Sequence, residues 1–123
     1  MSDVIFKRKI YSKLKEWKET SKGKTALLLE GARRIGKSTI VEEFAQKEYR
    51  SYILIDFNEA SKEVKELFDN LMDIDYIFLF LQNIYKATLY ERESVIIFDE
   101  VQQCPKARQA IKYLVKDGRY DYI

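Results

Sequence analysis

Histidine is absent from the 123-residue chain, and cysteine and proline each occur once. The absence of histidine excludes Ser-His-Asp catalysis, Cys-His catalysis and every metal site that uses an imidazole ligand. Any metal must therefore be held mainly by oxygen atoms, the ligands that Mg²⁺ prefers. Because Cys104 has no second cysteine in the chain, it cannot form an internal disulfide, which fits a reducing compartment such as the cytoplasm.

Long apolar segments are also missing. The longest unbroken apolar run, at residues 76–81, has six residues, whereas a membrane-spanning helix needs about 20. The first 24 residues carry charges throughout and contain no apolar stretch of the kind found in secretion signals. With 46% hydrophobic residues and a formal net charge of +2, residues 1–123 are predicted to form a single folded domain. We expect a soluble, cytoplasmic protein with no membrane partner.

Positive charge is concentrated at the amino terminus. Residues 1–24 contain eight basic and three acidic side chains, a net charge of +5, and the remaining residues carry a net charge of −3. Such a segment can attract the phosphate backbone of a nucleic acid. Ile10, Leu14 and Trp17 recur at helical spacing, however, so residues 1–22 are predicted to form a basic amphipathic helix whose lysines face water. We favour the solvated helix and keep nucleic-acid binding as an alternative.

The remaining segments alternate between two kinds of pattern. Short apolar runs predict strands at residues 25–30, 51–57, 94–98 and 120–123. Helical spacing predicts helices that begin at Lys37 and after the cap Ser61, and that span 75–92 and 105–117. Residues 75–92 are ambiguous, because their apolar start alone suits a strand, but the helical register continues to Thr88. Strands that alternate with helices predict an α/β fold with a parallel sheet and right-handed crossovers.

Residues 31–38, with the sequence GARRIGKS, match the Walker A pattern G-x-x-x-x-G-K-[ST] between a predicted strand and a predicted helix. Glycines let the backbone N–H groups approach phosphates closely, and the helix that follows adds a favourable dipole. Lys37 is predicted to contact the β- and γ-phosphates and to assist catalysis, Ser38 to bind Mg²⁺, and Thr39 to contact the α-phosphate. The predicted nucleotide-binding residues are Gly31, Arg33, Arg34, Ile35, Gly36, Lys37, Ser38 and Thr39.

The two arginines of this loop have two interpretations. Arg33 and Arg34 can contact phosphate or stabilise charge in the transition state. An arginine within such a loop is more often exposed to solvent. We therefore favour solvent exposure over a role in stabilising the transition state for these two arginines.

Residues 95–100, with the sequence VIIFDE, form an apolar run that ends in two carboxylates. This pattern is typical of a Walker B strand, in which Asp99 would hold Mg²⁺. Glu100 is then the candidate general base that activates the attacking water. Taken alone, the same pattern is equally typical of a buried strand that ends at an acidic loop, and its distance from the Walker A loop favours the functional interpretation.

The acidic pair also favours ATP over GTP. A GTPase would carry Asp-x-x-Gly at this strand, but Asp99 is followed by Glu100, Val101 and Gln102, and the guanine-binding pattern Asn-Lys-x-Asp does not occur in the chain. A P-loop kinase for a small molecule stays open, although a kinase would have little use for a carboxylate that activates water.

Two weaker candidates have structural alternatives. Asp56 ends a predicted strand on the side of the sheet where doubly wound folds bind ligands, and a role in capping the following loop explains it equally well. Cys104 is predicted to pack or cap rather than react.

The motifs GARRIGKS and IIFDEVQ, a helix that starts with proline and the basic helix RKIYSKLKEW together resemble the AAA-type P-loop ATPase domain of uncharacterised bacterial and archaeal ATPases. The resemblance covers residues 7–123 and implies a three-layer P-loop NTPase fold with the strand order fifth, first, fourth, third, second. It also implies ATP and Mg²⁺ as cofactors. In that family a sensor strand, further helices and often a restriction-endonuclease-like domain follow, so we expect this chain to be an amino-terminal fragment, truncated in the fourth strand.

Three functions follow from these patterns. The first is Mg²⁺-dependent ATP hydrolysis. The second is nucleotide binding with negligible turnover, because the sensor and an arginine finger are lacking. The third is nucleic-acid binding through the basic helix. A first strand without a fifth strand beside it would also leave an open sheet edge, through which the chain could self-associate.

Overall fold

The computed structural model describes residues 2–27, 37–69 and 73–123. For residues 2–7 and 37–39 it describes the backbone, and their side chains lie outside the description. The main helices and strands, in chain order, are α1 (Ser2–Ser21), α2 (Lys37–Glu48), β1 (Ser51–Asp56), α3 (Lys62–Glu66), α4 (Ile74–Tyr85), β2 (Ser94–Asp99), α5 (Pro105–Asp117) and β3 (Asp121–Tyr122). Two single 3₁₀ turns, η1 (Leu67–Asp69) and η2 (Val101–Gln103), follow α3 and β2 respectively.

The three strands form a parallel sheet in the order β1-β2-β3. The predicted first strand is only partly described, at residues 25–27, and there the Leu27 N–H donates to the Tyr122 carbonyl oxygen at 3.0 Å. The fourth predicted strand therefore lies between the first and the third, as the resemblance implied. The outer edge of the first strand, where we expected self-association, lies outside the described residues.

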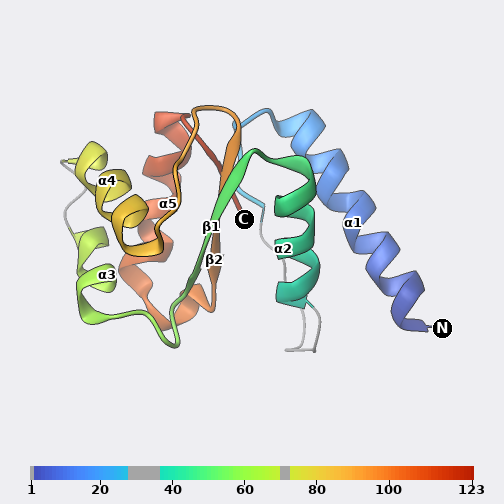
Figure 1. Cartoon of the computed structure of the whole chain (residues 1–123), viewed down its shortest axis with the longest axis horizontal. Helices are drawn as coiled ribbons and strands as arrows, with labels where there is room; N and C mark the ends of the chain where they lie inside the picture. The colour runs from blue at the N-terminus through green and yellow to red at the C-terminus, as the bar shows by residue number, and fades with distance from the viewer. Residues whose placement is uncertain (1, 28–36, 70–72) are drawn as a thin grey trace.

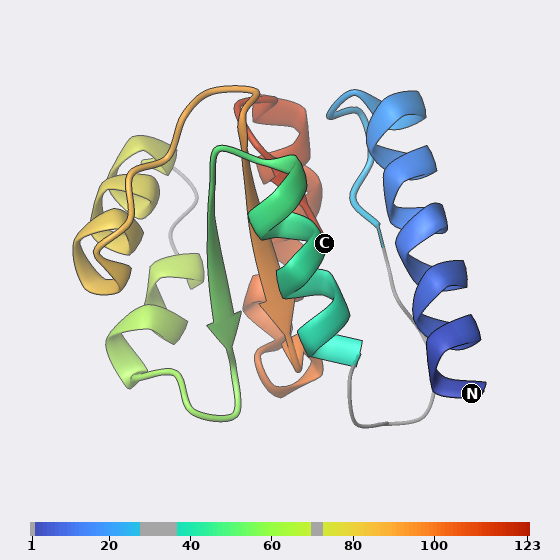
Figure 2. The ribbon, with the colours of Figure 1, turned by 45° about the vertical axis from the view of Figure 1, so that its right-hand side comes forward.

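Helices cover both faces of the sheet (Figure 1). Helices α1 and α2 lie on one side, and α3, α4 and α5 lie on the other (Figures 1 and 2). Strand β2 supplies both cores because side chains alternate along a strand. Val95 and Ile97 pack with the residues of α1 and α2, whereas Ile96 and Phe98 pack with those of α3 to α5. The three-layer α/β fold predicted from the sequence is confirmed.

The predicted faces and ends of two helices agree with the structure. The apolar face of α2 is buried against the sheet and consists of Ile40, Val41, Phe44 and Ala45. Helix α5 begins at Pro105 and ends before Gly118, which has a left-handed φ of 83°. Pro105 loses no helical hydrogen bond at the first turn, and Gly118 adopts the left-handed conformation without a Cβ penalty.

Helix α4 is shorter than the sequence predicted. It ends at Tyr85, and Lys86 takes a left-handed conformation with a φ of 51°, so Thr88 lies outside the helix. The side chain of Gln82 stops the helix, because its Oε1 accepts the Leu89 N–H at 2.9 Å and so holds the chain in a turn. The backbone oxygen of Gln82 accepts the Ala87 N–H at 3.2 Å, which completes the cap.

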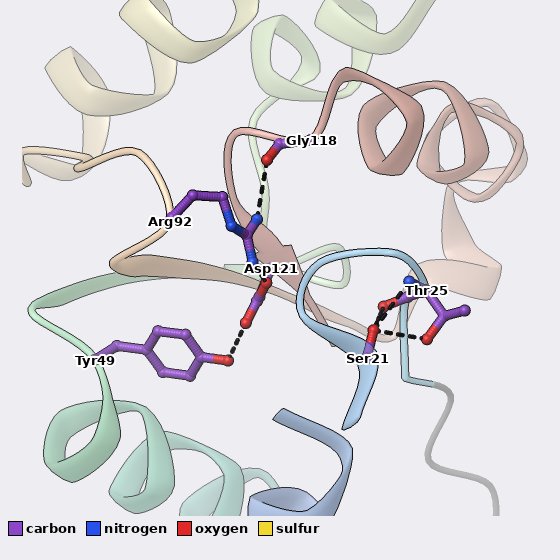
Figure 3. A network of polar contacts seen from close by, with 6 residues as sticks. All are labelled: Ser21, Thr25, Tyr49, Arg92, Gly118 and Asp121. Carbon is purple, nitrogen blue, oxygen red and sulfur yellow. Dashed lines mark hydrogen bonds and ion pairs between the residues drawn. The ribbon is translucent and has the colours of Figure 1, made fainter. Parts of the chain in front are cut away.

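A buried polar network joins the amino ends of the strands (Figure 3). The carboxylate of Asp121, 5% exposed, accepts a hydrogen bond from the Tyr49 hydroxyl and forms an ion pair with Arg92. Arg92 also donates to the Gly118 carbonyl oxygen at 2.9 Å. The network links the segments that enter β1, β2 and β3, at the sheet edge opposite the predicted site.

The turn after α1 packs against the same arginine. Gly23 has a φ of 83°, and a Cβ atom there would lie 2.5 Å from the Arg92 guanidinium. Beside it the Ser21 hydroxyl accepts the Thr25 N–H at 3.0 Å and contacts the Thr25 hydroxyl at 2.9 Å (Figure 3). The left-handed backbone conformation therefore favours glycine at position 23, and a side chain there would displace the Arg92 guanidinium.

This network predicts a loss of stability at high pH. Burial, and then the hydrogen bond to Asp121, raise the pKa of Tyr49 far above its usual value of 10.0. When folding raises the pKa of a group, the contribution of that group to the unfolding free energy is fully present below its unfolded-state pKa. The contribution is lost as the pH rises above that value. Tyr49→Phe should therefore flatten the fall in unfolding free energy between about pH 9 and about pH 11 by up to about 1.4 kcal/mol per pH unit.

Urea unfolding at stepped pH measures this slope. Tyr113→Phe, at an exposed position, is the matched control and should follow the unsubstituted chain. Some slope should remain in Tyr49→Phe, because burial also raises the pKa of Tyr122. Equal slopes for Tyr49→Phe and the unsubstituted chain would contradict the role of the buried hydroxyl.

Candidate functional site

Two strands end in carboxylates at one edge of the sheet. Asp56 is the last residue of β1, Asp99 is the last residue of β2, and the two are register partners in the parallel pair. The amino end of α2 lies at this same edge, where the tips of both strand arrows point (Figure 2). The structure therefore brings the predicted Walker B residues to the side of the sheet from which α2 starts.

Asp99 is held in place through its backbone. Its carbonyl oxygen accepts the Phe57 N–H at 3.0 Å, and the preceding residue, Phe98, donates its N–H to the Ile123 carbonyl oxygen at 2.8 Å. The Phe98 ring packs edge-on against Phe57 and Phe68, with ring centroids 5.6 and 5.5 Å away. Neighbours on both sides of β2 thus fix the strand end, while the Asp99 side chain is partly exposed at the edge.

Glu100 follows in a left-handed backbone conformation, with φ 56° and ψ 41°. A non-glycine residue rarely adopts this region, and such strain is concentrated at functional sites. The chain then forms the 3₁₀ turn Val101–Gln103, within which the side-chain amide of Gln102 donates to Glu100 Oε2. This contact was not predicted from the sequence, because it depends on the backbone conformation of Glu100.

Asp56 serves as a loop cap. Its Oδ1 accepts the Asn58 N–H at 2.9 Å, and its carbonyl oxygen accepts the N–H groups of Glu59 and Ala60. The structure therefore supports the capping alternative over a direct ligand role. Asp56 also acts on a neighbour, since burial, followed by the Asp56 charge, raises the pKa of Tyr85.

The Walker A residues are only partly described. Lys37, Ser38 and Thr39 form the first turn of α2 in the described backbone. The other predicted binding residues, Gly31, Arg33, Arg34, Ile35 and Gly36, lie outside the described residues. The buried face of α2 fixes this helix to β2, so its first turn has a defined place beside the strand ends.

The sequence predicted an oxygen-ligated metal. Among residues 2–27, 37–69 and 73–123, no group of three or more His, Cys, Asp or Glu side chains could hold a metal ion. A preformed all-protein metal cage is therefore absent from this part of the chain. The partly exposed Asp99 carboxylate is a hard oxygen donor, which fits Mg²⁺ bound mainly by phosphates and water.

Cys104 and the basic helix have structural roles in the described chain. Cys104 is buried, and its carbonyl oxygen accepts the Ala107 N–H at the start of α5. In α1, Leu14 and Trp17 face the interior, as predicted. Lys15 pairs with Glu48 at 3.6 Å, and Lys18 lies 4.9 Å from the centre of the Tyr49 ring. The solvated-helix interpretation therefore accounts for α1.

No helix in the described part of the chain has the length and apolar character needed to cross a lipid bilayer.

Comparison with known proteins identifies the family. A family model described as an AAA domain, a class of nucleotide-binding domain, matches residues 23–123. Searches of the curated proteins and of the solved structures gave no significant match. The match covers the first predicted strand, the segments predicted to be the Walker A and Walker B motifs, and the whole described sheet, so the chain belongs to the AAA domain family.

Proposed function

We propose that the chain binds ATP together with Mg²⁺ and hydrolyses it to ADP and phosphate. The observation that carries this proposal is the position of Asp99, which ends β2, and of Glu100, which follows it, at the edge of the sheet from which α2 begins. Membership of the AAA domain family supports the nucleotide-binding part. The two carboxylates support hydrolysis over binding alone, because a base next to the metal ligand serves to activate water.

The nucleotide phosphates would lie at the amino end of α2. Backbone N–H groups there lack helical partners, and the helix dipole favours negative charge. Lys37 would add a charge-assisted contact to the β- and γ-phosphates, and Thr39 a contact to the α-phosphate. The loop residues 31–36 would supply further N–H groups, as their glycines permit.

Ser38 and Asp99 would hold Mg²⁺, the former at the start of α2 and the latter at the end of β2. When bound, the ion neutralises charge on the β- and γ-phosphate oxygens. Glu100 would take a proton from water as the water oxygen bonds to the γ-phosphorus. The bond from that phosphorus to the β–γ bridging oxygen then breaks, which leaves ADP and inorganic phosphate.

The metal assignment is tested with two matched variants at the strand ends. Asp99→Asn should reduce the apparent affinity for Mg²⁺ in the ATP complex at least tenfold, because it removes the charge of the proposed ligand. Asp56→Asn keeps an oxygen acceptor for the Asn58 N–H and should leave the Mg²⁺ dependence unchanged. Isothermal titration calorimetry of Mg²⁺ into each protein in the presence of ATP measures the apparent Mg²⁺ affinity of both variants.

Three outcomes separate the possibilities. Loss of Mg²⁺ dependence in Asp56→Asn alone would assign the ligand to β1 instead of β2. Equal Mg²⁺ affinity for all proteins would contradict the role of Asp99. Equal affinity for ATP and GTP would contradict the assignment of ATP as the substrate.

A further inference from the structure

The exposed turn after β2 contains Gln102, a side chain that the proposed hydrolysis mechanism does not use. Gln102 donates a hydrogen bond from its Nε2 to Glu100 Oε2. We propose that Gln102 is a positioning residue that orients the Glu100 carboxylate towards the attacking water. This inference rests on the proposed hydrolysis, and it adds a residue that neither Walker motif contains.

The backbone explains why residue 102 contacts residue 100. The backbone of Glu100 has a left-handed conformation, so the chain turns directly after the strand. The Gln103 N–H donates to the Glu100 carbonyl oxygen at 3.0 Å, and the Cys104 N–H donates to the Val101 carbonyl oxygen at 2.9 Å. These two bonds close the 3₁₀ turn, in which the Gln102 amide lies within hydrogen-bond reach of Glu100 Oε2.

The turn is fixed at both ends. Before it, the Asp99 carbonyl oxygen is bound to the Phe57 N–H of the neighbouring segment. After it, Cys104 is buried and α5 buries Ala107, Ala110 and Leu114 in the core. The Gln102 amide is therefore presented from a rigid support, which a positioning contact requires.

The chemistry of an amide suits this task. A glutamate side chain has several rotatable bonds, and one hydrogen bond to a carboxylate oxygen restricts them. A neutral amide orients the carboxylate while leaving its negative charge in place, whereas a lysine or arginine would add an opposing charge. Because small misplacements of a reacting group slow a reaction strongly, a lost orienting bond should appear in the rate and not in ATP affinity.

The chain offers a matched control in the next residue. Gln103 has the same side chain, lies in the same 3₁₀ turn and is exposed, as Gln102 is. In the described part of the chain, the Gln102 side chain donates to Glu100, whereas the Gln103 side chain makes no hydrogen bond. A comparison of the two positions therefore separates the specific contact from a general effect on the turn.

The first test detects the contact without enzyme activity. In ¹⁵N-labelled protein, Glu100→Ala removes the acceptor of this hydrogen bond, so the side-chain amide resonances of Gln102 should shift relative to those of the unsubstituted chain, and those of Gln103 should not. Resonances of Gln102 and Gln103 that respond alike would overturn the inference.

The second test is kinetic. Gln102→Met keeps a neutral side chain of similar length but lacks the amide donor, and it should lower kcat for ATP roughly tenfold with an unchanged Kd for ATP, whereas Gln103→Met should change neither. In the Glu100→Gln background, Gln102→Met should have no further effect, because its role acts through Glu100. If Gln102 had only a structural role, its substitution would lower kcat by the same factor in the unsubstituted chain and in the Glu100→Gln variant. That result would overturn the proposal.

The same cycle distinguishes the two proposals. If Glu100→Gln removes turnover but Gln102→Met matches the unsubstituted chain, the positioning role is wrong and the hydrolysis mechanism stands. If Glu100→Gln turns over as fast as the unsubstituted chain, the proposed base is wrong, and the role of Gln102 is wrong with it.

Discussion

Lys37→Ala should weaken the binding of Mg-ATP by roughly 30- to 100-fold, because it removes a charge-assisted hydrogen bond to the phosphates. Lys37 is the first residue of α2, which starts at the edge of the sheet where Asp99 ends β2. The backbone N–H groups of the first turn stay in the variant and account for the residual affinity. Isothermal titration calorimetry of ATP in the presence of Mg²⁺ measures the change.

A lysine at the other end of the same helix provides the control. Lys47 lies in the last turn of α2, is exposed and pairs with Glu43 at 2.9 Å. Lys47→Ala should leave ATP affinity unchanged, since an exposed ion pair at the far end of the helix contributes little and does not reach the proposed site. ATP at a hundred times its Kd should also stabilise the unsubstituted chain by about 2.7 kcal/mol, which thermal unfolding detects. Equal ATP affinity for Lys37→Ala and Lys47→Ala would contradict the location of the site.

Local signals in the sequence predicted the sheet and its helices. The apolar run at 94–98 predicted a strand, and in the structure the side chains of this run are buried on both faces of β2, which explains why the run shows no alternation. Pro105 and Gly118 mark the ends of α5, because each has a conformational preference that acts within one turn. The strand order came from the family resemblance, since periodicity says nothing about which strands pair.

Contacts that depend on tertiary structure could not be predicted. The end of α4 is set by the Gln82 side chain, which reaches Leu89 seven residues later only once the chain has turned. The bond from Tyr49 to Asp121 joins residues 72 positions apart. Neither pair has a local pattern, so the predicted helix extended too far and the buried network was missed.

The candidate site also combines residues that local sequence patterns predicted with contacts that depend on tertiary structure. The Walker patterns predicted Asp99 and Glu100, and the structure places both at the expected edge of the sheet. The contact between Gln102 and Glu100 was not predicted, because it needs the left-handed conformation at Glu100, which sequence preferences disfavour. Asp56 had two equal interpretations, and only its bond to Asn58 decided between them.

Glu100 is the proposed general base of the reaction. Glu100→Gln should lower kcat for ATP hydrolysis by roughly 100-fold or more, because an amide cannot accept the proton that water releases. It should leave ATP affinity nearly unchanged, since the substitution preserves the size of the side chain and Lys37, Ser38 and the backbone N–H groups stay in place. The variant should therefore remain in its ATP-bound form, as measured by single-turnover phosphate release and by retention of labelled ATP.

A glutamate at the other end of the same strand is the matched control. Glu93 directly precedes β2 and pairs with Arg50 at 3.4 Å on the exposed surface, at the edge opposite the site. Glu93→Gln loses the same charge from the protein as Glu100→Gln, so any effect of net charge on ATP binding or turnover appears in both. A selective loss of turnover in Glu100→Gln assigns the proton transfer to that carboxylate. If both variants turn over at the rate of the unsubstituted chain, water is activated by another group, and the general-base role of Glu100 is wrong.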